Sequence, residues 1–365
     1  VYDMEQFVQA GEGFLGFNNG ELFTKDFFGS TNEANNIHDG RWAGLTMPTI
    51  ADLDSELERS QIPHNANGFL RSPWSNNQEE KVLRASSACG EDVVANDEAA
   101  ACAALESLTS QASFEDWYEA VSYNPHGPVH MLLGGVTGDC EDKWDDVEAA
   151  GIADAAGVEV RIWRKQSDFY LKNGWRYDYL ECSSTEGCSC LHYALYQKDT
   201  DAAFKFLLNA AVVGSSDVKD QLSDSDILLL VEAICTSDII VGDSLQSSSS
   251  WTPEFWTIHG TVERMYQLRR AQGPWDGGDF DWDEGKGSWM FDQARCEGHL
   301  AEDSVLLGRD QVKLKGQRTD VNIREFLTLL EPDNMHELDY VYDTVDFEYC
   351  GPDLQVVADH PDVDN

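Results

Sequence analysis

Two short segments carry histidines in patterns typical of metal ligands, and they constrain the fold because they lie far apart in the chain. Residues 123–135 read YNPHGPVHMLLGG and place His126 and His130 four positions apart. On a helix this spacing puts both imidazoles on one face, one turn apart. Residues 252–266 read TPEFWTIHGTVERMY, and His259 lies near the start of another predicted helix. Three neutral imidazoles suit copper, zinc, iron or nickel, so we expect the three rings to converge on one metal ion.

A histidine pair at helical spacing also occurs as two polar residues that cap or line a core. The Gly134-Gly135 continuation and the Phe255-Trp256 pair before His259 favour the metal site over that interpretation. The remaining histidines show no matching motif: His38, His64, His192, His299, His336 and His360. His38 and His64 lie in Gly- and Asn-rich contexts, which predict solvated loops.

The residues around the three histidines resemble the second copper-binding half of a tyrosinase-like type 3 copper domain, the kind found in tyrosinases, catechol oxidases and hemocyanins. In that family the first segment ends in a Gly-Gly pair, and the second reads roughly Asp-Pro-x-Phe-Trp-x-His-His-x-x-x-Asp-Arg. Residues 22–30 and 39–44 resemble the stretch that follows the first copper site. Residues 338–343 (LDYVYD) resemble the signature that closes the domain, so the matched blocks extend from about Val1 to Cys350.

The resemblance implies a mainly α fold: an antiparallel helical-bundle core with long loops and a large α+β insertion. Residues 1–138 would form the N-terminal part of the core with the first two ligands, and residues 139–250 the insertion. Residues 251–350 would complete the core with the third ligand, followed by an acidic tail over residues 351–365. The family's connection is far shorter than this insertion, so we expect the insertion to leave and re-enter the core close to the ligands.

The resemblance also implies copper held by His126, His130 and His259, with dioxygen and a small phenolic molecule as reactants. A type 3 site has two coppers, and the family's first three ligands precede the matched segments. Val1-Tyr2-Asp3 resembles a landmark just after that first site. We therefore expect the first copper site on a separate chain or segment, with a one-copper or copper-free descendant as the alternative. Ile258 stands where most relatives carry a supporting histidine, whose loss typically weakens metal affinity or activity about 10–100-fold.

Family members oxidise phenols or catechols to quinones, or carry oxygen. In those that hydroxylate monophenols, an asparagine commonly follows the first ligand of this copper and acts with a nearby glutamate. Here Gly127 occupies that position, and Glu119 is the candidate catalytic carboxylate. We therefore expect oxidation of diphenols to be favoured over hydroxylation of monophenols. Two alternatives stay open: a structural or extracellular matrix protein on a degenerate oxidase fold, and an oxygen carrier.

Local patterns predict the elements of the chain. Helices are expected over residues 98–107, 201–213 and 224–235, and over residues 113–121 with Ser113 as the N-cap. The run VEVRIW at residues 158–163 predicts a strand. Four serines at residues 247–250 predict a flexible linker that returns the chain to the core.

Charge and cysteine content restrict partners and compartment. A net charge of −42 argues against binding to nucleic acid or to an anionic membrane surface, and no apolar run approaches the roughly 20 residues of a membrane span. Nine cysteines include Cys182, Cys188 and Cys190, which fit disulfides better than a zinc knuckle. We therefore expect an extracellular protein or one in the lumen of an oxidising compartment. The acidic residues 276–284 lack the pattern of a calcium loop, and a solvated loop is favoured.

Overall fold

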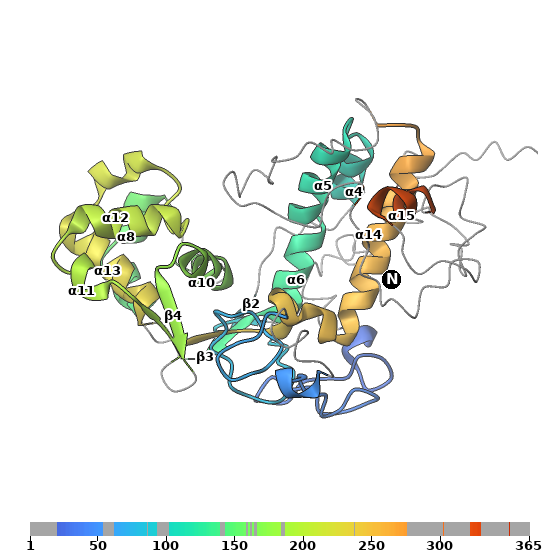
Figure 1. Ribbon diagram of the computed structural model, residues 1–365, viewed down its shortest axis with the longest axis horizontal. Coiled ribbons are helices and arrows are strands. Elements are labelled where there is room, and N and C mark those ends of the chain that lie inside the picture. The colour runs from blue at the N-terminus through green and yellow to red at the C-terminus, as the bar shows by residue number, and fades with distance from the viewer. Residues whose placement is uncertain are drawn as a thin grey trace, which may run out of the picture. The chain divides into compact units, whose positions relative to one another are not determined.

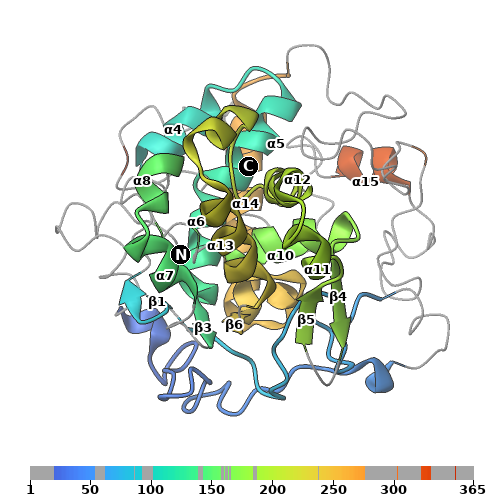
Figure 2. The same ribbon diagram turned by 90° about the vertical axis from the view of Figure 1, so that its left-hand side faces the viewer.

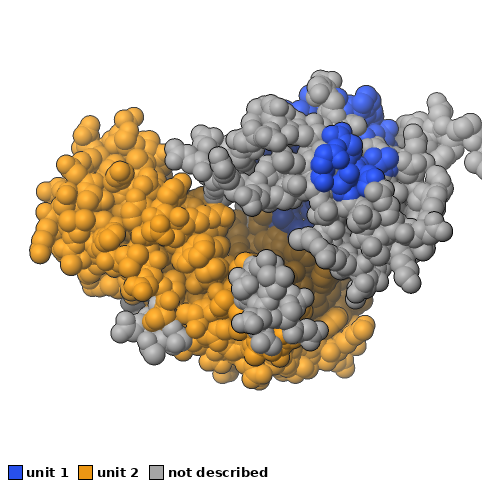
Figure 3. Space-filling model, viewed as in Figure 1, with its two compact units in different colours: residues 1–5, 98–126, 259–365 blue, residues 6–97, 127–258 orange. Residues whose placement is uncertain are grey.

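The computed structural model describes residues 20–53, 62–85, 87–92, 102–138, 143–157, 160, 163, 166–183, 187–236, 238–275, 302, 322–329 and 350. Over these residues the chain is mainly helical with few strands, as the sequence predicts. The chain divides into two compact units, which Figure 3 shows in different colours. Unit 1 comprises residues 1–5, 98–126 and 259–365, and unit 2 comprises residues 6–97 and 127–258. The domain boundaries expected at residues 138 and 250 stay predictions.

Unit 1 is helical. Its elements are α4 (Cys102–Thr109), α5 (Phe114–Tyr123), the part of α14 (Pro253–Ala271) from His259 onward, and α15 (Ile323–Leu329). Helix α5 begins where expected, because the Ser113 side chain accepts a hydrogen bond from the Asp116 amide. The core is formed by apolar and aromatic side chains of α4, α5 and α14, among them Leu105, Leu108, Trp117, Val121, Met265, Tyr266 and Leu268.

Unit 2 contains a helical cluster and a small sheet. The helices are α6 (His126–Gly134, whose first residue belongs to unit 1), α7 (Lys143–Ala149), α8 (Ile152–Ala156), α10 (Ser167–Arg176), α11 (Tyr193–Tyr196), α12 (Thr200–Asn209) and α13 (Asp224–Cys235). Helices α11, α12 and α13 pack side by side (Figures 1 and 2). Leu230 and Val231 of α13 and Phe206 and Leu207 of α12 have no exposed surface, so these helices supply a separate apolar core. Helices α12 and α13 confirm the expectations for residues 201–213 and 224–235, with α12 ending at Asn209.

The sheet joins segments that precede α7 in the chain to one that follows α13. Its strand order is β2-β1-β3-β6, formed by β1 (Ser87–Ala88), β2 (Glu91–Asp92), β3 (Val136–Gly138) and β6 (Ile239–Val241). Strand β3 follows α6 directly and pairs antiparallel with β6, with Val136 opposite Val241. The excursion after residue 138 therefore returns to the strand that it left, which confirms that its two ends lie together next to a histidine-bearing helix.

The strand expected over residues 158–163 is wrong. Val160 and Trp163, the described residues of this run, are helical and are both buried. Their three-residue spacing suits one face of a helix. The Trp163 ring stacks on Trp144 at 5.6 Å between centroids, and its indole nitrogen donates to the Val212 carbonyl. Tertiary packing thus overrides the β-propensity of the valines and isoleucine.

The flexible serine linker is also wrong. Residues 247–250 form the start of the short 3-10 helix η5 (Ser247–Trp251), and the preceding turn is η4 (Asp243–Leu245). Ser248 is fully buried, and its hydroxyl donates to the Asp243 carboxylate at 2.8 Å. Serine composition alone predicts flexibility only where the hydroxyls meet water. Here a buried carboxylate holds the segment.

The remaining short elements belong to unit 2. They are η1 (Glu21–Phe23), η2 (Ile50–Asp52), η3 (Ser216–Gln221) and the hairpin of β4 (Leu180–Ser183) with β5 (Gly187–Cys190). The stretch up to residue 68 contains only 3-10 turns and isolated bridges where it is described, as its Gly- and Asn-rich sequence predicts. Several sequence predictions lie outside the described residues: those on residues 1–3, 98–101, 276–284, 338–343 and 351–365, and on His299, His336 and His360.

Disulfides confirm the expected use of the cysteines. The pairs are Cys102–Cys350, Cys182–Cys188 and Cys190–Cys235, and Cys89 is also disulfide-bonded. The cysteine cluster at residues 182–190 is therefore no zinc knuckle. Disulfides persist in oxidising environments, which is consistent with an extracellular or lumenal protein. None of the helices in the described part of the chain combines the length and apolar character that a bilayer crossing needs.

Candidate metal centre

Helix α6 presents two of the expected ligands. It begins at His126, and Pro128 lies in its first turn, where a missing backbone N–H does not break the helix. His130 follows four residues after His126, so both imidazoles lie on one side of the helix. Both residues are partly buried. The predicted helix and the predicted placement of this pair are confirmed.

Helix α14 presents the third ligand. Pro253 stands at its first position, where its fixed φ favours helix initiation, and His259 follows six residues later. The Nε2 atoms of His126 and His259 lie 3.3 Å apart, with their rings in an edge-on arrangement. The structure therefore brings His259 to the histidine helix, as the sequence predicts.

The distances suit a single metal ion. One ring nitrogen from each of His126, His130 and His259 lies within 4.8 Å of the others. Two nitrogens that bind one ion at about 2.0–2.1 Å, separated by a tetrahedral angle, lie about 3.3–3.4 Å apart. The 3.3 Å separation of the His126 and His259 Nε2 atoms matches this value. The three histidines can thus bind a metal ion, and an all-imidazole set leaves its identity open among copper, zinc, iron and nickel.

A backbone carbonyl fixes the orientation of His130. Its Nδ1 lies 2.6 Å from the Ser244 carbonyl oxygen. A carbonyl only accepts hydrogen bonds, so Nδ1 carries the proton and Nε2 is left with its lone pair. Metal-bound histidines typically donate their second nitrogen in this way. Burial lowers the pKa of His130, although the Ser244 hydrogen bond acts in the opposite direction. The lowered pKa favours the neutral imidazole that metals require.

Two glycines allow Ser244 to approach α6 closely. Gly134 ends α6, and a Cβ there would lie 2.5 Å from the Leu245 Cβ. A Cβ on Gly242 would lie 1.8 Å from the Gly134 carbonyl oxygen. The Gly242 amide also donates to the Gly135 carbonyl at 3.0 Å. Gly134, the first residue of the Gly-Gly pair in the histidine motif, thus permits the contact between α6 and η4 together with Gly242.

Apolar residues flank the ligands. Phe255 lies one helical turn before His259, and its ring centroid is 6.2 Å from that of His130. Ile258, at the position where a supporting histidine is expected from the resemblance, is 3% exposed and belongs to the apolar core. Support for the ligands therefore comes from elsewhere, and for His130 it comes from the Ser244 carbonyl.

Glu119 does not belong to the ligand group that the described residues form. It lies exposed on α5, one turn before Tyr123. Burial and the Glu119 charge both raise the pKa of Tyr123. The catalytic role of Glu119 stays a prediction.

The other described histidines are exposed. His38 and His64 each place Nδ1 3.1 Å from a backbone carbonyl, of Ser30 and Ile62 respectively. His192 is exposed at the start of α11. The prediction that His38 and His64 are solvated loop residues is confirmed.

Sequence reasoning did not identify Ser244 or the buried polar residues around it. Its contribution is a backbone oxygen, which every residue possesses, so no side-chain pattern marks it. The acidic residues Asp243 and Glu254 gave a weak signal, because acids close to a ligand motif are candidates for burial. No protein-family model, curated protein or solved structure matches this chain.

Proposed function

We propose that His126, His130 and His259 bind one copper ion, and that the protein uses it to oxidise catechols to quinones. The observation that carries the proposal is the convergence of three imidazoles, with two Nε2 atoms at the spacing of ligands that share an ion. Copper is favoured over the other imidazole-binding metals by the resemblance of the ligand motifs to the type 3 copper family. The other copper of a type 3 pair would be bound by a separate chain or segment.

The residues of this chain would bind and orient. His130 would bind through Nε2, because its Nδ1 proton is held by Ser244. His126 and His259 would also bind through Nε2, since these are the atoms that face each other. When bound, copper supplies an electron acceptor and a coordination position for dioxygen. In the net reaction two catechols lose two protons and two electrons each, and one dioxygen is reduced to two waters.

The surroundings of His126 favour diphenols over monophenols. Gly127 has no side chain that could orient a water molecule for deprotonation of a monophenol. We therefore propose catechol oxidation as the main activity, with Glu119 as the candidate carboxylate.

Copper titration of the purified protein tests the metal site. We expect about one copper per chain in the unmodified protein, and strongly reduced binding in His130→Ala and His259→Ala. The matched control is His64→Ala, which removes an exposed histidine whose Nδ1 also meets a backbone carbonyl. Equal copper binding by the unmodified protein, His130→Ala and His259→Ala would show that the three histidines do not form the site.

Oxygen uptake with catechol tests the activity on copper-loaded protein. Quinone formation that disappears in His259→Ala would support the proposal. Copper binding with reversible oxygen binding and no quinone would indicate an oxygen carrier. Copper-loaded protein without either property would indicate a structural protein on this fold.

A further inference from the structure

We propose that the buried Arg71–Asp243 ion pair and Glu254 are positioning residues for His130, which act by holding the Ser244 carbonyl against its Nδ1. The inference deepens the proposed function and rests on the metal site proposed above. Arg71 and Asp243 lie outside the histidine motifs, and Glu254 lies within the second motif but is not one of its expected ligands. The structure connects them to the ligand through one turn of 3-10 helix, η4.

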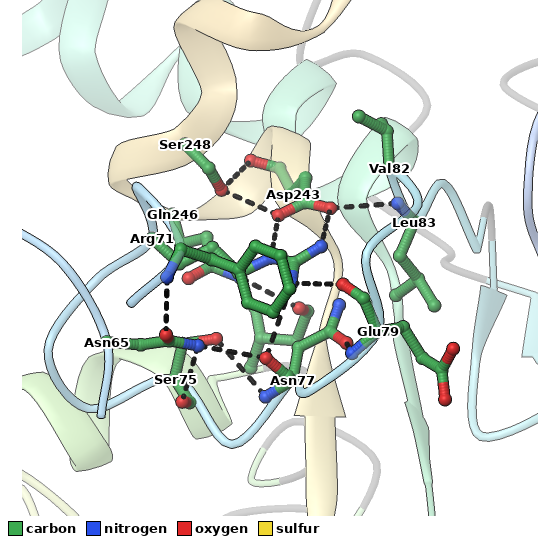
Figure 4. Close-up of polar contacts among 12 residues, drawn as sticks. Asn65, Arg71, Ser75, Asn77, Glu79, Val82, Leu83, Asp243, Gln246 and Ser248 are labelled. Carbon is green, nitrogen blue, oxygen red and sulfur yellow. Dashed lines mark hydrogen bonds and ion pairs between the residues drawn. The ribbon is translucent and has the colours of Figure 1, made fainter. Parts of the chain in front are cut away.

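Asp243 anchors one side of this turn. Its carboxylate accepts hydrogen bonds from Arg71 Nε at 2.8 Å, Arg71 Nη2 at 3.0 Å, the Leu83 amide at 2.8 Å and the Ser248 hydroxyl at 2.8 Å (Figure 4). Asp243 and Arg71 have no exposed surface. The carboxylate is therefore held from several directions, and Ser244 is the next residue in the chain.

Arg71 is equally constrained. Its remaining donors reach backbone carbonyls, those of Asn77, Glu79 and Lys81. A guanidinium is a rigid planar fork, so this many contacts fix its position. Arg71 thus ties η4 to the loop of residues 71–81 through the ion pair with Asp243.

Glu254 anchors the other side of η4. The Ser244 hydroxyl donates to its carboxylate at 2.9 Å, and that hydroxyl also lies 3.2 Å from the Thr252 hydroxyl. Glu254 is fully buried, and Arg84 Nη1 lies 3.8 Å from its second oxygen. Glu254 stands in the first turn of α14, the helix that also carries His259.

Stability alone is a weak reason to bury these charges. Replacing a buried ion pair with apolar side chains is often neutral or stabilising, because the charges lose their hydration. The nitrogens of Arg71 all donate to acceptors, and hydrogen bonds of this kind give a definite geometry instead. That geometry places the Ser244 oxygen 2.6 Å from His130 Nδ1. Residues of this kind around a metal typically change its affinity 10–100-fold when mutated.

The binding test uses Zn²⁺ on the full-length protein, since zinc binds imidazole without redox chemistry. We expect Asp243→Asn to weaken Zn²⁺ affinity about 10–100-fold. The matched control is Asp168→Asn, which alters another buried carboxyl of unit 2 that accepts a hydrogen bond from the Trp74 indole. The control should change Zn²⁺ affinity less than about twofold. Equal affinities of the two variants would overturn the proposal.

Two milder variants keep the test decisive if Asp243→Asn does not fold. Ser244→Ala removes the hydroxyl bonded to Glu254 and leaves the carbonyl, and Glu254→Gln removes the ionisable carboxyl and leaves an acceptor. Both should weaken Zn²⁺ binding, by less than the loss of Asp243. Unchanged binding in both folded variants would exclude Glu254 as a positioning residue.

A second measurement needs no metal. The ¹⁵N chemical shifts of the His130 ring in the metal-free protein report which nitrogen carries the proton. We expect the Nδ1–H tautomer in the unmodified protein and a mixture of tautomers in Asp243→Asn. If the unmodified protein binds no metal, the proposed function fails, while this tautomer shift would still support positioning. An unshifted tautomer in the variant would refute positioning even where metal binding is intact.

Discussion

Replacing Gly242 with alanine is the most direct test of the contact that brings η4 to the histidine helix. The backbone of Gly242 has φ −67° and ψ 156°, which any residue adopts, so the substitution introduces no backbone strain. The new Cβ would lie 1.8 Å from the Gly134 carbonyl oxygen, whereas ordinary contact begins at 3.4 Å. The two segments must separate by the difference of 1.6 Å. Neither contact partner is a flexible side chain that could move aside.

The cost and the consequence for the site follow from this distance. Overpacking of this kind destabilises by about 1–3 kcal/mol, and occasionally more. If half of the separation reaches Ser244, its oxygen moves from 2.6 Å to about 3.4 Å from His130 Nδ1, beyond the usual limit of about 3.2 Å. We therefore expect Gly242→Ala to lose both stability and metal affinity.

Urea unfolding of the metal-free protein and Zn²⁺ titration measure the two effects separately. The control is Gly214→Ala in the same unit, where an added Cβ meets nothing within 4 Å. The reasoning is refuted if Gly242→Ala unfolds at the same urea concentration as Gly214→Ala and binds Zn²⁺ as tightly as the unmodified protein.

Three further predictions concern other parts of the chain. Burial raises the pKa of Asp168 above its ordinary 3.8 despite the Trp74 hydrogen bond. The stabilising contribution of the protonated Asp168 carboxyl to the free energy of unfolding is therefore fully present below pH 3.8. It is lost as the pH rises through the folded-state pKa. Urea unfolding at several pH values should show that the unmodified protein loses this contribution relative to Asp168→Asn, and parallel pH profiles would contradict it. Gly127→Asn should raise the ratio of monophenol to diphenol turnover of copper-loaded protein, by about 10²-fold or less, and an unchanged ratio would remove Gly127 from the argument. Replacing Cys102 with serine should cost about 2–5 kcal/mol in thermal unfolding, because the disulfide to Cys350 closes a long loop; an unchanged melting temperature would refute that.

Local signals in the sequence were sufficient where one helix turn decides the outcome. Ser113 predicts the start of α5 because the N-cap bond needs only the next three residues. The spacing of His126 and His130 predicts a shared face for the same reason. The proximity of His259 to His126 and His130 depends on long-range packing, and only the family-like motif around His259 indicated it.

The failures lie where distant packing decides. Residues 158–163 contain strand-forming side chains, but Val160 and Trp163 are helical and buried. Ser248 lies in a run that predicts a linker, but Asp243 offers its hydroxyl a buried acceptor. For Trp163 the deciding partners, Trp144 and the Val212 carbonyl, lie outside the window in which local propensity acts. Asp243 is only five positions from Ser248, but its burial depends on the distant Arg71.

The metal support was also beyond prediction. His130 is held by the carbonyl of Ser244, and that residue lies 114 positions away in the chain. Its place depends on Arg71, which comes from a third segment. A single sequence contains no pattern that joins these three positions.

The pairing of β3 with β6 makes the intervening 100 residues, 139–238, the tip of one very long hairpin. Even as a flexible chain, a loop of this length would cost only about 2 kcal/mol more to close than a loop of ten residues. Its length can therefore change at little entropic cost to closing the ladder that holds its two ends. Such a segment can evolve as a separate module that recombination exchanges or shortens. Helix α6 and the residues that support His130 lie outside this segment and would keep their places.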